Sequence, residues 1–364
     1  MSGPRTLRYY VAKRFLLAIG ATFAVCAALI FMIDMIELLR LSRRAQDLST
    51  AHLLWMAALR MPAFSEILLA FAVLVGSIAA LLSLNRKSEL IVMRSAGMSV
   101  WQFLWPGAIV ALLIGIAEIT LLNPLAAVAF SEAERQMAKA FGTEATILAS
   151  TSDGLWLRED GPDGQSVVTA RASANQGMSL AGVVIYQFDV VGRFVERIDA
   201  ERATLEDGYW DLKKVIVSRP LAEPEFFDTY TVSTHLLRDQ VGEAFGSEMA
   251  LSFWQLSSLI EMAQRAGLQA SRYKVQYALL MSRPLLLLTM VVLAATVSLR
   301  AFRSGGIQVL VIAGMVGGTS FFLLVEVSRQ VGVAGLIPPT VAVWVPIALA
   351  LLVSLTVLLH QEDG

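Results

Sequence analysis

Six apolar runs constrain this chain more than any other feature of its sequence. They cover residues 15–36, 62–84, 104–130, 275–299, 307–327 and 337–359. A helix of about 20 residues, rising about 1.5 Å per residue, is about 30 Å long, which matches the hydrocarbon core of a bilayer. Only 16% of the residues are charged, whereas soluble domains have about 25%. The sequence therefore predicts an α-helical membrane protein with six transmembrane helices.

Lysine and arginine in the short loops predict the orientation. Loops rich in these residues stay in the cytoplasm, and three groups of them place both termini there: Arg5, Arg8, Lys13 and Arg14; Arg86, Lys87 and Arg94; Arg300 and Arg303. A fourth group falls on the outer side and breaks the rule: Arg40, Arg43, Arg44 and Arg60. These outer arginines call for a separate explanation.

A long polar segment, residues 131–274, separates the third and fourth predicted helices. It contains strand-like runs at 154–158, 166–172, 180–189, 193–206, 209–219 and 226–235, with Asp-Gly turn signals at 160–161, 163–164 and 207–208. Residues 252–266 change to a helical period, Ser252 and Gln255 form a capping-box pattern, and Gly267 is placed as a stop. The predicted domains are thus helices 1–3 (residues 1–130), an external all-β domain (131–274) and helices 4–6 (275–364).

No motif in the sequence predicts catalysis. His52, His235 and His360 are scattered, and neither an HExxH motif nor a Walker A motif occurs. Cys26 is the single cysteine and lies in an apolar run, so it gives no sign of a disulfide. We expect no catalytic residue, metal or cofactor in this chain and no nucleic-acid partner, and ATP hydrolysis would need another chain.

Ionisable residues inside the apolar runs are more informative. They are Asp34, Glu66, Glu118, Arg283 and Glu326. A charge in lipid costs at least about 2.5 kcal/mol, so such residues usually face a bundle interior or a cavity. Two interpretations stay open: the acids pair with arginines and lock the bundle, or they line a cavity that opens toward the outer leaflet.

A cavity of this kind would carry a basic rim. The outer-side basic residues are Arg40, Arg43, Arg44, Arg60, Arg135, Lys139 and Arg272, with Arg283 nearer the cavity. Guanidinium groups bind phosphate through paired hydrogen bonds. An apolar chamber with such a rim suits an amphiphile with fatty chains and an anionic head, which would explain the arginines that break the orientation rule.

Residues 85–103, NRKSELIVMRSAGMSVWQF, form a charged segment between two apolar runs. Apolar Leu90, Ile91 and Met93 alternate with charged Glu89 and Arg94, which predicts a short amphipathic helix at about 86–101. Gly97 interrupts it. Taken alone, the pattern is also that of a surface helix anchored by basic residues.

The same segment carries a resemblance to a known family. Residues 85–98, NRKSELIVMRSAGM, resemble the coupling helix of the LptF/LptG permeases, the membrane part of the bacterial lipopolysaccharide-export ABC transporter. The resemblance extends along the chain through Arg8-Tyr9 with Lys13, Gly154-Leu-Trp, Arg283-Pro284 and Gly335-Leu-Ile-Pro-Pro. Of these, Gly-Leu-Trp and Gly-Leu-Ile-Pro-Pro are more similar to the LptG branch than to the LptF branch.

The resemblance implies the fold, the partners and the location. It implies a periplasmic β-jellyroll-like domain and an inner-membrane protein that pairs with LptF and rides on two copies of the ATPase LptB. ATP and Mg would be bound by LptB and not by this chain. Lipopolysaccharide would be extracted from the outer leaflet of the inner membrane and passed to LptC and LptA.

The resemblance also implies roles for particular residues. The coupling residues would be Arg86, Ser88, Glu89, Arg94 and Gly97, with Glu89 pairing with a basic residue of the ATPase. Arg135 and Lys139 fall where the family has cavity-facing basic residues. Related chains can carry a basic residue at the position of Asp34, and this departure shifts a phosphate-binding role to Arg40, Arg43 and Arg44.

Two other classes of transporter stay open. A proton-coupled secondary transporter could use Glu118 or Glu326 as relay acids, although no inverted repeat is visible. A lipoprotein-releasing or division-type ABC permease could also use a cytoplasmic coupling segment, but those proteins generally place the external domain after the first helix. Copurification of a separate ATPase would exclude the first class, and loss of outer-membrane lipopolysaccharide on depletion would exclude the second.

Overall fold

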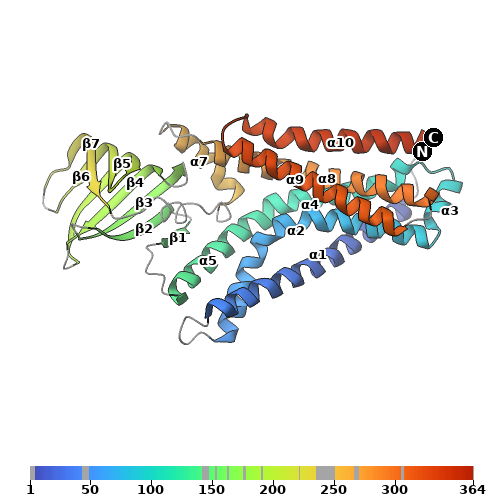
Figure 1. Ribbon diagram of the computed structural model, residues 1–364, viewed down its shortest axis with the longest axis horizontal. Helices are drawn as coiled ribbons and strands as arrows, with labels where there is room; N and C mark the ends of the chain where they lie inside the picture. The colour runs from blue at the N-terminus through green and yellow to red at the C-terminus, as the bar shows by residue number, and fades with distance from the viewer. Residues whose placement is uncertain are drawn as a thin grey trace. The chain divides into compact units, whose positions relative to one another are not determined.

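A computed structural model describes most of the chain (Figure 1). The described residues are 5–42, 49–141, 147–151, 154–161, 164–174, 178–189, 192–220, 222–234, 251–265, 270–304 and 307–363. They divide into two compact units. The helical unit comprises Met1–Asp34, Phe64–Asn123 and Tyr277–Gly364, and the sheet unit comprises Met35–Ala63 and Pro124–Gln276.

Long helices account for the apolar runs. The helices are α1 (Arg5–Ser42), α2 (Thr50–Arg86), α3 (Glu89–Ser95), α4 (Val100–Ala117), the π-helix η1 (Glu118–Leu122), α5 (Asn123–Phe141), α7 (Phe253–Arg265), α8 (Ser271–Ser304), α9 (Ile307–Val333) and α10 (Pro339–Asp363). Five stretches within the described residues are long and apolar enough to cross a membrane: Arg5–Ser42, Thr50–Arg86, Val100–Ala133, Ser271–Leu299 and Pro339–Gln361. The first four predicted spans and the last are therefore confirmed as membrane-length helices.

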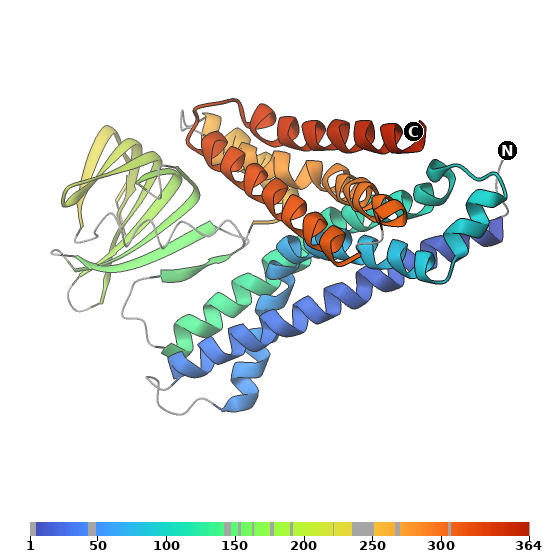
Figure 2. The same ribbon diagram turned by 45° about the vertical axis from the view of Figure 1, so that its right-hand side comes forward.

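The remaining predicted span, residues 307–327, falls on α9. This helix is 27 residues long, but the side chains of residues 307–311 and 313 lie outside the described part of the chain. The sixth span therefore stays a prediction. Helices α9 and α10 lie side by side in both views (Figures 1 and 2).

Glycines let these helices approach one another closely. A Cβ atom at Gly314 of α9 would lie 3.1 Å from Ile78 Cδ1 of α2, and one at Gly318 would overlap Leu74 Cδ2 of the same helix. The two glycines are four residues apart, so they lie on one face of α9, in the small-xxx-small pattern of membrane helices. The pattern serves packing within this chain.

The sheet unit contains one seven-stranded antiparallel sheet. Its strands are β1 (Ile147–Thr151), β2 (Gly154–Gly161), β3 (Gly164–Ala174), β4 (Ser179–Phe188), β5 (Phe194–Glu206), β6 (Tyr209–Ser218) and β7 (Glu225–Ser233). Neighbours in the sheet follow chain order from β1 to β7. The six strand-like runs are thus confirmed as strands β2 to β7, and β1 was missed.

Each described strand of the sheet pairs with the next one along the chain. A jelly roll has two packed sheets joined by Greek-key crossovers, whereas the described strands form a meander in which each strand pairs with the next. Short turns explain this order. Asp207 and Gly208 form a two-residue turn with Glu206 opposite Tyr209, and Gly208 adopts φ 89°, which glycine accepts without strain. The insertion of an antiparallel β domain is confirmed, and its jelly-roll-like form stays a prediction.

The sheet is strongly curved (Figure 2), and buried apolar side chains of its strands form a core. Core side chains normally alternate along a strand, but in β4 this alternation is interrupted between Leu180 and Val183. In β6 it is interrupted between Leu212 and Val215. Gly182 and Lys214, inside these intervals, have φ of 60° and 52°. Local departures from regular strand geometry bend a strand and re-aim its side chains. The two interruptions occur at one level, because Val183 pairs with Ala200 and Ala200 pairs with Val215.

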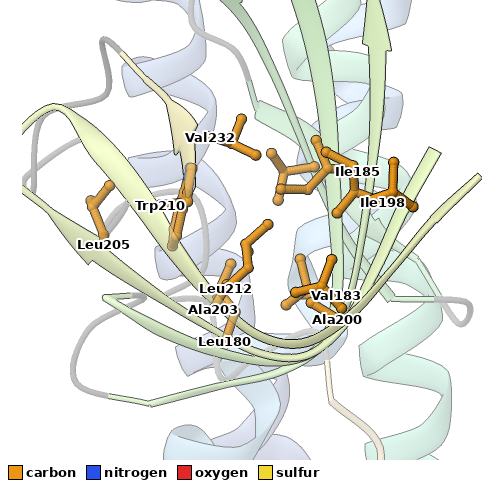
Figure 3. Close-up of a cluster of buried hydrophobic side chains, with 14 residues drawn as sticks. Leu180, Val183, Ile185, Ile198, Ala200, Ala203, Leu205, Trp210, Leu212 and Val232 are labelled. Atoms are coloured by element: carbon orange, nitrogen blue, oxygen red, sulfur yellow. The ribbon is translucent and has the colours of Figure 1, made fainter. Parts of the chain in front are cut away.

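The curved face encloses the core of the sheet unit. Figure 3 shows side chains of β4, β5, β6 and β7 converging there, including fully buried Trp210. The amphipathic helix α7 lies against β3 and β4. The predicted helix at 252–266 is confirmed, and the backbone N–H of Ser252 donates to Gln255 Oε1 at 3.2 Å, which is one half of the predicted capping box. The predicted stop, Gly267, lies outside the described residues.

Candidate functional site

The predicted coupling segment forms the short helix α3. Glu89 is its first residue, and Ser88 before it adopts a left-handed conformation with φ 56°. Gly97 ends it with φ 81°, the Gly97 N–H donates to the Arg94 carbonyl at 2.9 Å, and the Met98 N–H donates to the Met93 carbonyl at 3.1 Å. These two bonds form a Schellman motif, which commonly places glycine just past a helix end. The predicted interruption at Gly97 is confirmed.

The two faces of this segment differ in exposure. Leu90 and Met93 are buried, whereas Ile91 and Val92 are exposed. The predicted coupling residues Arg86, Ser88, Arg94 and Gly97 are also exposed. We define Arg86–Gly97 as the coupling segment. Its outer face therefore combines apolar and basic side chains.

Glu89 differs from the other predicted coupling residues because it is held within the chain. The hydroxyl of Tyr10, on α1, donates to Glu89 Oε1 at 3.0 Å. Arg14, one turn further along α1, donates to the Tyr10 oxygen from Nε at 3.0 Å and from Nη2 at 2.8 Å. Sequence reasoning missed Tyr10 and Arg14 because nothing in the sequence joins them to a residue 79 positions away.

A second site, inside the helical unit, gathers ionisable residues of the predicted spans. Arg283 on α8 has Nη2 3.7 Å from Glu66 Oε2 on α2 and Nη1 3.6 Å from Glu118 Oε1 on η1. Arg283 Nη1 also donates to the Glu66 carbonyl oxygen at 2.9 Å, and Asn123 Nδ2 donates to Glu66 Oε1 at 2.6 Å. We refer to Glu66, Glu118, Asn123 and Arg283 as the Arg283 cluster.

The π-helix explains why two residues of one chain segment face this cluster. Residues five apart in an α-helix lie about 140° apart around the axis. In η1 the Asn123 N–H bonds to the Glu118 carbonyl, an i to i+5 contact that widens the turn. Glu118 and Asn123 are both buried. The wider turn thus lets the side chains of Glu118 and Asn123 both face the Arg283 cluster.

A close approach of two helices brings Arg283 to Glu118. A Cβ atom at Gly115 of α4 would lie 2.6 Å from Pro284 Cα and 2.9 Å from Pro284 N on α8. Such distances leave no room for a side chain, so only glycine permits this contact between backbones. Pro284 follows Arg283, and Gly115 lies three residues before Glu118.

Burial leaves this cluster incompletely bonded. Glu118 is fully buried, and neither of its carboxylate oxygens has a hydrogen-bond partner among the described residues. Two carboxylates thus share one guanidinium, at ion-pair distances longer than hydrogen bonds. Pairing of intramembrane acids with an arginine, one of the two interpretations drawn from the sequence, is what the structure shows for Glu66 and Glu118.

The other two intramembrane acids lie apart from the cluster. Glu326 on α9 accepts from Arg329 Nη2 at 2.7 Å and from Gln330 Nε2 at 2.9 Å, both on its own helix. Asp34 on α1 is buried. Roles for these acids in transport stay predictions.

The first part of the predicted basic rim follows α1. Arg40 lies in the last turn of α1 with its side chain largely exposed, and its Nη2 is 3.0 Å from Glu37 Oε1. Arg43 and Arg44 lie outside the described residues. Their predicted contact with an anionic head group stays a prediction.

The second part of the rim is on other helices of the sheet unit. Arg135 and Lys139 belong to α5, but their side chains lie outside the described part of the chain. Arg60 on α2 and Arg272 on α8 are half-buried. Arg283, also predicted to bind substrate, is engaged by the two glutamates described above.

No group of three or more histidine, cysteine, aspartate or glutamate residues that could hold a metal ion occurs among the residues that the structure describes. The expectation that this chain carries no metal or cofactor stays a prediction.

Comparison with known proteins shows the family of this chain. A family model described as lipopolysaccharide export system permease LptF/LptG matches residues 9–360. The chain therefore belongs to the LptF/LptG permease family. It is similar to the lipopolysaccharide export system permease protein LptG of Haemophilus influenzae, with 24% identity over 98% of this chain and 99% of that protein. It is also 26% identical to the protein of the same name from Escherichia coli K12, over 84% of each chain.

Proposed function

We propose that this chain is an LptG-type permease subunit of the lipopolysaccharide-export ABC transporter in the bacterial inner membrane. It extracts lipopolysaccharide from the outer leaflet of that membrane and passes it to a periplasmic bridge of LptC and LptA. LptF is its partner permease, and ATP with Mg is bound and hydrolysed by the LptB dimer. The observation that carries the proposal is the family match over residues 9–360. The LptG assignment draws on the two similar proteins, both named LptG.

The coupling segment supports a link to an ATPase. It is a short helix with an exposed basic and apolar outer face, made by Arg86, Ile91, Val92 and Arg94. An apolar patch rimmed by charge suits docking to a protein surface. We assign the contact with the ATPase to this segment. Ser88 and Glu89 mark the start of its helix, and Gly97 marks the end.

Replacement of Glu89 tests this assignment. Glu89→Ala removes the carboxylate from the first residue of α3, so it should weaken association with LptB or uncouple ATP hydrolysis from export, while the chain still inserts. The measurements are LptB copurification, ATP hydrolysis and export of lipopolysaccharide from reconstituted vesicles. Glu223→Ala is the matched control, because Glu223 is an exposed acid of the sheet unit. Normal LptB binding and normal export by Glu89→Ala would contradict the coupling role.

The basic rim supports an anionic amphiphile as the substrate. We assign Arg40, Arg43, Arg44, Arg135 and Lys139 to contacts with lipid A phosphates. Each charge-assisted bond contributes about 1.5–3 kcal/mol, less where water screens it. Charge reversal at Arg43 and Arg44 together should therefore reduce photo-crosslinking of lipopolysaccharide and its export, and leave basal ATP hydrolysis nearly intact. Export equal to that of the parent would make these arginines ordinary surface charges.

The same purified preparations distinguish two alternative functions. The paralogous LptF role predicts that the chain copurifies with an LptG protein in place of LptF. A proton-coupled transporter of amphiphiles would bind no ATPase, and its export would depend on Glu118 or Glu326. Copurification of LptB and a second permease, followed by their identification, decides between these functions.

A further inference from the structure

The hydroxyl of Tyr10 joins α1 to α3 through a chain of hydrogen bonds. Two donors of Arg14 reach the Tyr10 oxygen, and the Tyr10 hydroxyl donates to Glu89 Oε1 at 3.0 Å. A hydroxyl that accepts a bond from a cation is polarised and donates more strongly, and a carboxylate is a strong acceptor. The contact therefore links a positive residue of α1 to a negative residue of α3 through one side chain.

The geometry of α1 preorganises this link. Tyr10 and Arg14 are four residues apart and lie on one face of the helix. The guanidinium carbon of Arg14 is 5.1 Å from the centroid of the Tyr10 ring, a distance that fits a cation–π contact. Beside them, Phe15 is fully buried and would collide with any side chain at Gly107 of α4. The first turns of α1 are thus fixed against the helical unit.

The apolar middle of α1 is much less buried than its first turns. Only 6% of its most apolar 18-residue window is buried within this chain. Contacts near the N-terminal turns therefore contribute a large share of what attaches the first predicted span to the helical unit. A displacement of α3 can reach α1 through these turns.

The orientation of Glu89 also supports a link between α3 and α1. Its second carboxylate oxygen, Oε2, is buried and has no hydrogen-bond partner among the described residues. The carboxylate is thus directed into the protein toward α1, whereas Arg86 and Arg94 of the same segment are exposed. A side chain whose only role was to meet a partner protein would be expected to lie open to solvent.

We propose that Tyr10 is a positioning residue that ties the coupling segment to the first predicted span, so that a displacement of α3 by the ATPase is passed to α1 through Glu89. The inference rests on the proposed function for the source of the displacement. The contact between Tyr10 and Glu89 does not depend on that function.

Hydrogen–deuterium exchange of the purified full chain in detergent tests the contact. Tyr10→Phe removes one oxygen and keeps the ring, so the protein should fold while the amides of Glu89–Ser95 exchange several-fold faster. Tyr9→Phe is the matched control, because Tyr9 is 72% exposed and its loss should change nothing. In a Glu89→Ala background Tyr10→Phe should add no further exchange. Equal exchange in the parent and Tyr10→Phe, or an undiminished effect of Tyr10→Phe without Glu89, would overturn the link.

Reconstitution with the partner permease and the ATPase tests the transmission. Tyr10→Phe should keep the ATPase bound and hydrolysing, and lower the amount of lipopolysaccharide exported per ATP by about tenfold, the factor that corresponds to one hydrogen bond to a charged group. Tyr9→Phe should match the parent. A parent chain that binds no ATPase overturns the proposed function and this inference together. A parent that exports normally, with a Tyr10→Phe variant indistinguishable from it, overturns this inference alone.

Discussion

The Arg283 cluster and a cluster on the sheet carry the same charges in different surroundings. In the sheet unit Arg219 faces Glu196 and Glu225, so each cluster combines one arginine with two glutamates. Arg219 Nε is 2.8 Å from Glu196 Oε2, and Arg219 Nη1 is 3.3 Å from Glu225 Oε2. The Tyr230 hydroxyl adds a bond to Glu196 Oε1 at 3.2 Å. The sheet cluster is therefore directly hydrogen-bonded.

The two clusters differ in how they satisfy their charges. Arg219 and Glu225 are about half exposed, so water can serve the donors and acceptors that the protein leaves open. Partial burial, and then the nearby carboxylate of Glu196, raise the pKa of Tyr230, which keeps its hydroxyl protonated as a donor. In the helical unit Arg283 has a side-chain exposure of 16% and Glu118 of 0%. Buried charges depend on one another, and exposed charges depend mainly on water.

The largest expected effect is therefore the loss of Arg283. Arg283→Met leaves Glu66 and Glu118 buried without their cation, and breaking a buried pair typically destabilises by about 3–5 kcal/mol. We expect a strongly lowered midpoint of thermal unfolding in detergent, followed by circular dichroism.

A neutral version of the same site controls for the loss of the side chain itself. Arg283→Met combined with Glu66→Gln and Glu118→Gln removes every charge, and replacing a whole buried network is often nearly neutral. The combined variant should recover most of the lost stability. If it unfolds as early as Arg283→Met alone, the charges of the cluster are not the cause of its sensitivity.

An intermediate effect is expected from the contact between backbones beside the cluster. Gly115→Ala places a methyl group 2.6 Å from Pro284 Cα, which must push α4 away from α8. Overpacking of this kind destabilises by about 1–3 kcal/mol. Gly317→Ala is the matched control in another helix, because no atom of the described residues lies within 4 Å of the place that its Cβ would take. A thermal midpoint for Gly115→Ala equal to that of the control would show that the helices can separate freely here.

The smallest effect is expected on the sheet. Arg219→Met removes a cation of the same kind that also faces two carboxylates, but partly exposed ion pairs contribute only about 0–1 kcal/mol. The thermal midpoint should change little, and higher salt should reduce the difference further because exposed charges are screened. A loss of stability as large as that of Arg283→Met would show that exposed and buried clusters do not differ in this respect.

Features set by local composition were predictable from the sequence. Hydrophobicity over about 20 residues identified the membrane-length helices, and alternation between turn signals identified β2 to β7. The end of α3 at Gly97 followed from the freedom of glycine to adopt positive φ. The strand β1 was missed because Ile147–Thr151 carries two apolar residues and then small or polar ones, which gives little alternation.

The sequence did not predict the order of the strands in the sheet. The described strands pair in chain order as a meander, and the jelly roll that the family resemblance implies stays a prediction. The bend in the sheet was also not predicted, since Lys214 at φ 52° has no turn signal around it. Lys214 lies between Lys213 and Val215, which pair with Arg202 and Ala200 of β5, and its Nζ lies 2.6 Å from Glu201 Oε2.

The sequence by itself determined that this chain has membrane-length helices, an inserted β domain and a charged segment between the second and third apolar runs. Those properties depend on residues that are neighbours in the chain. Only the tertiary structure decided that Arg283 meets Glu66, 217 positions away, and that Tyr10 meets Glu89, 79 positions away. The physical reason is that the energy of a buried charge or hydrogen bond depends on its partner. Helix packing, through close contacts such as Gly115 against Pro284, determines which residue that partner is.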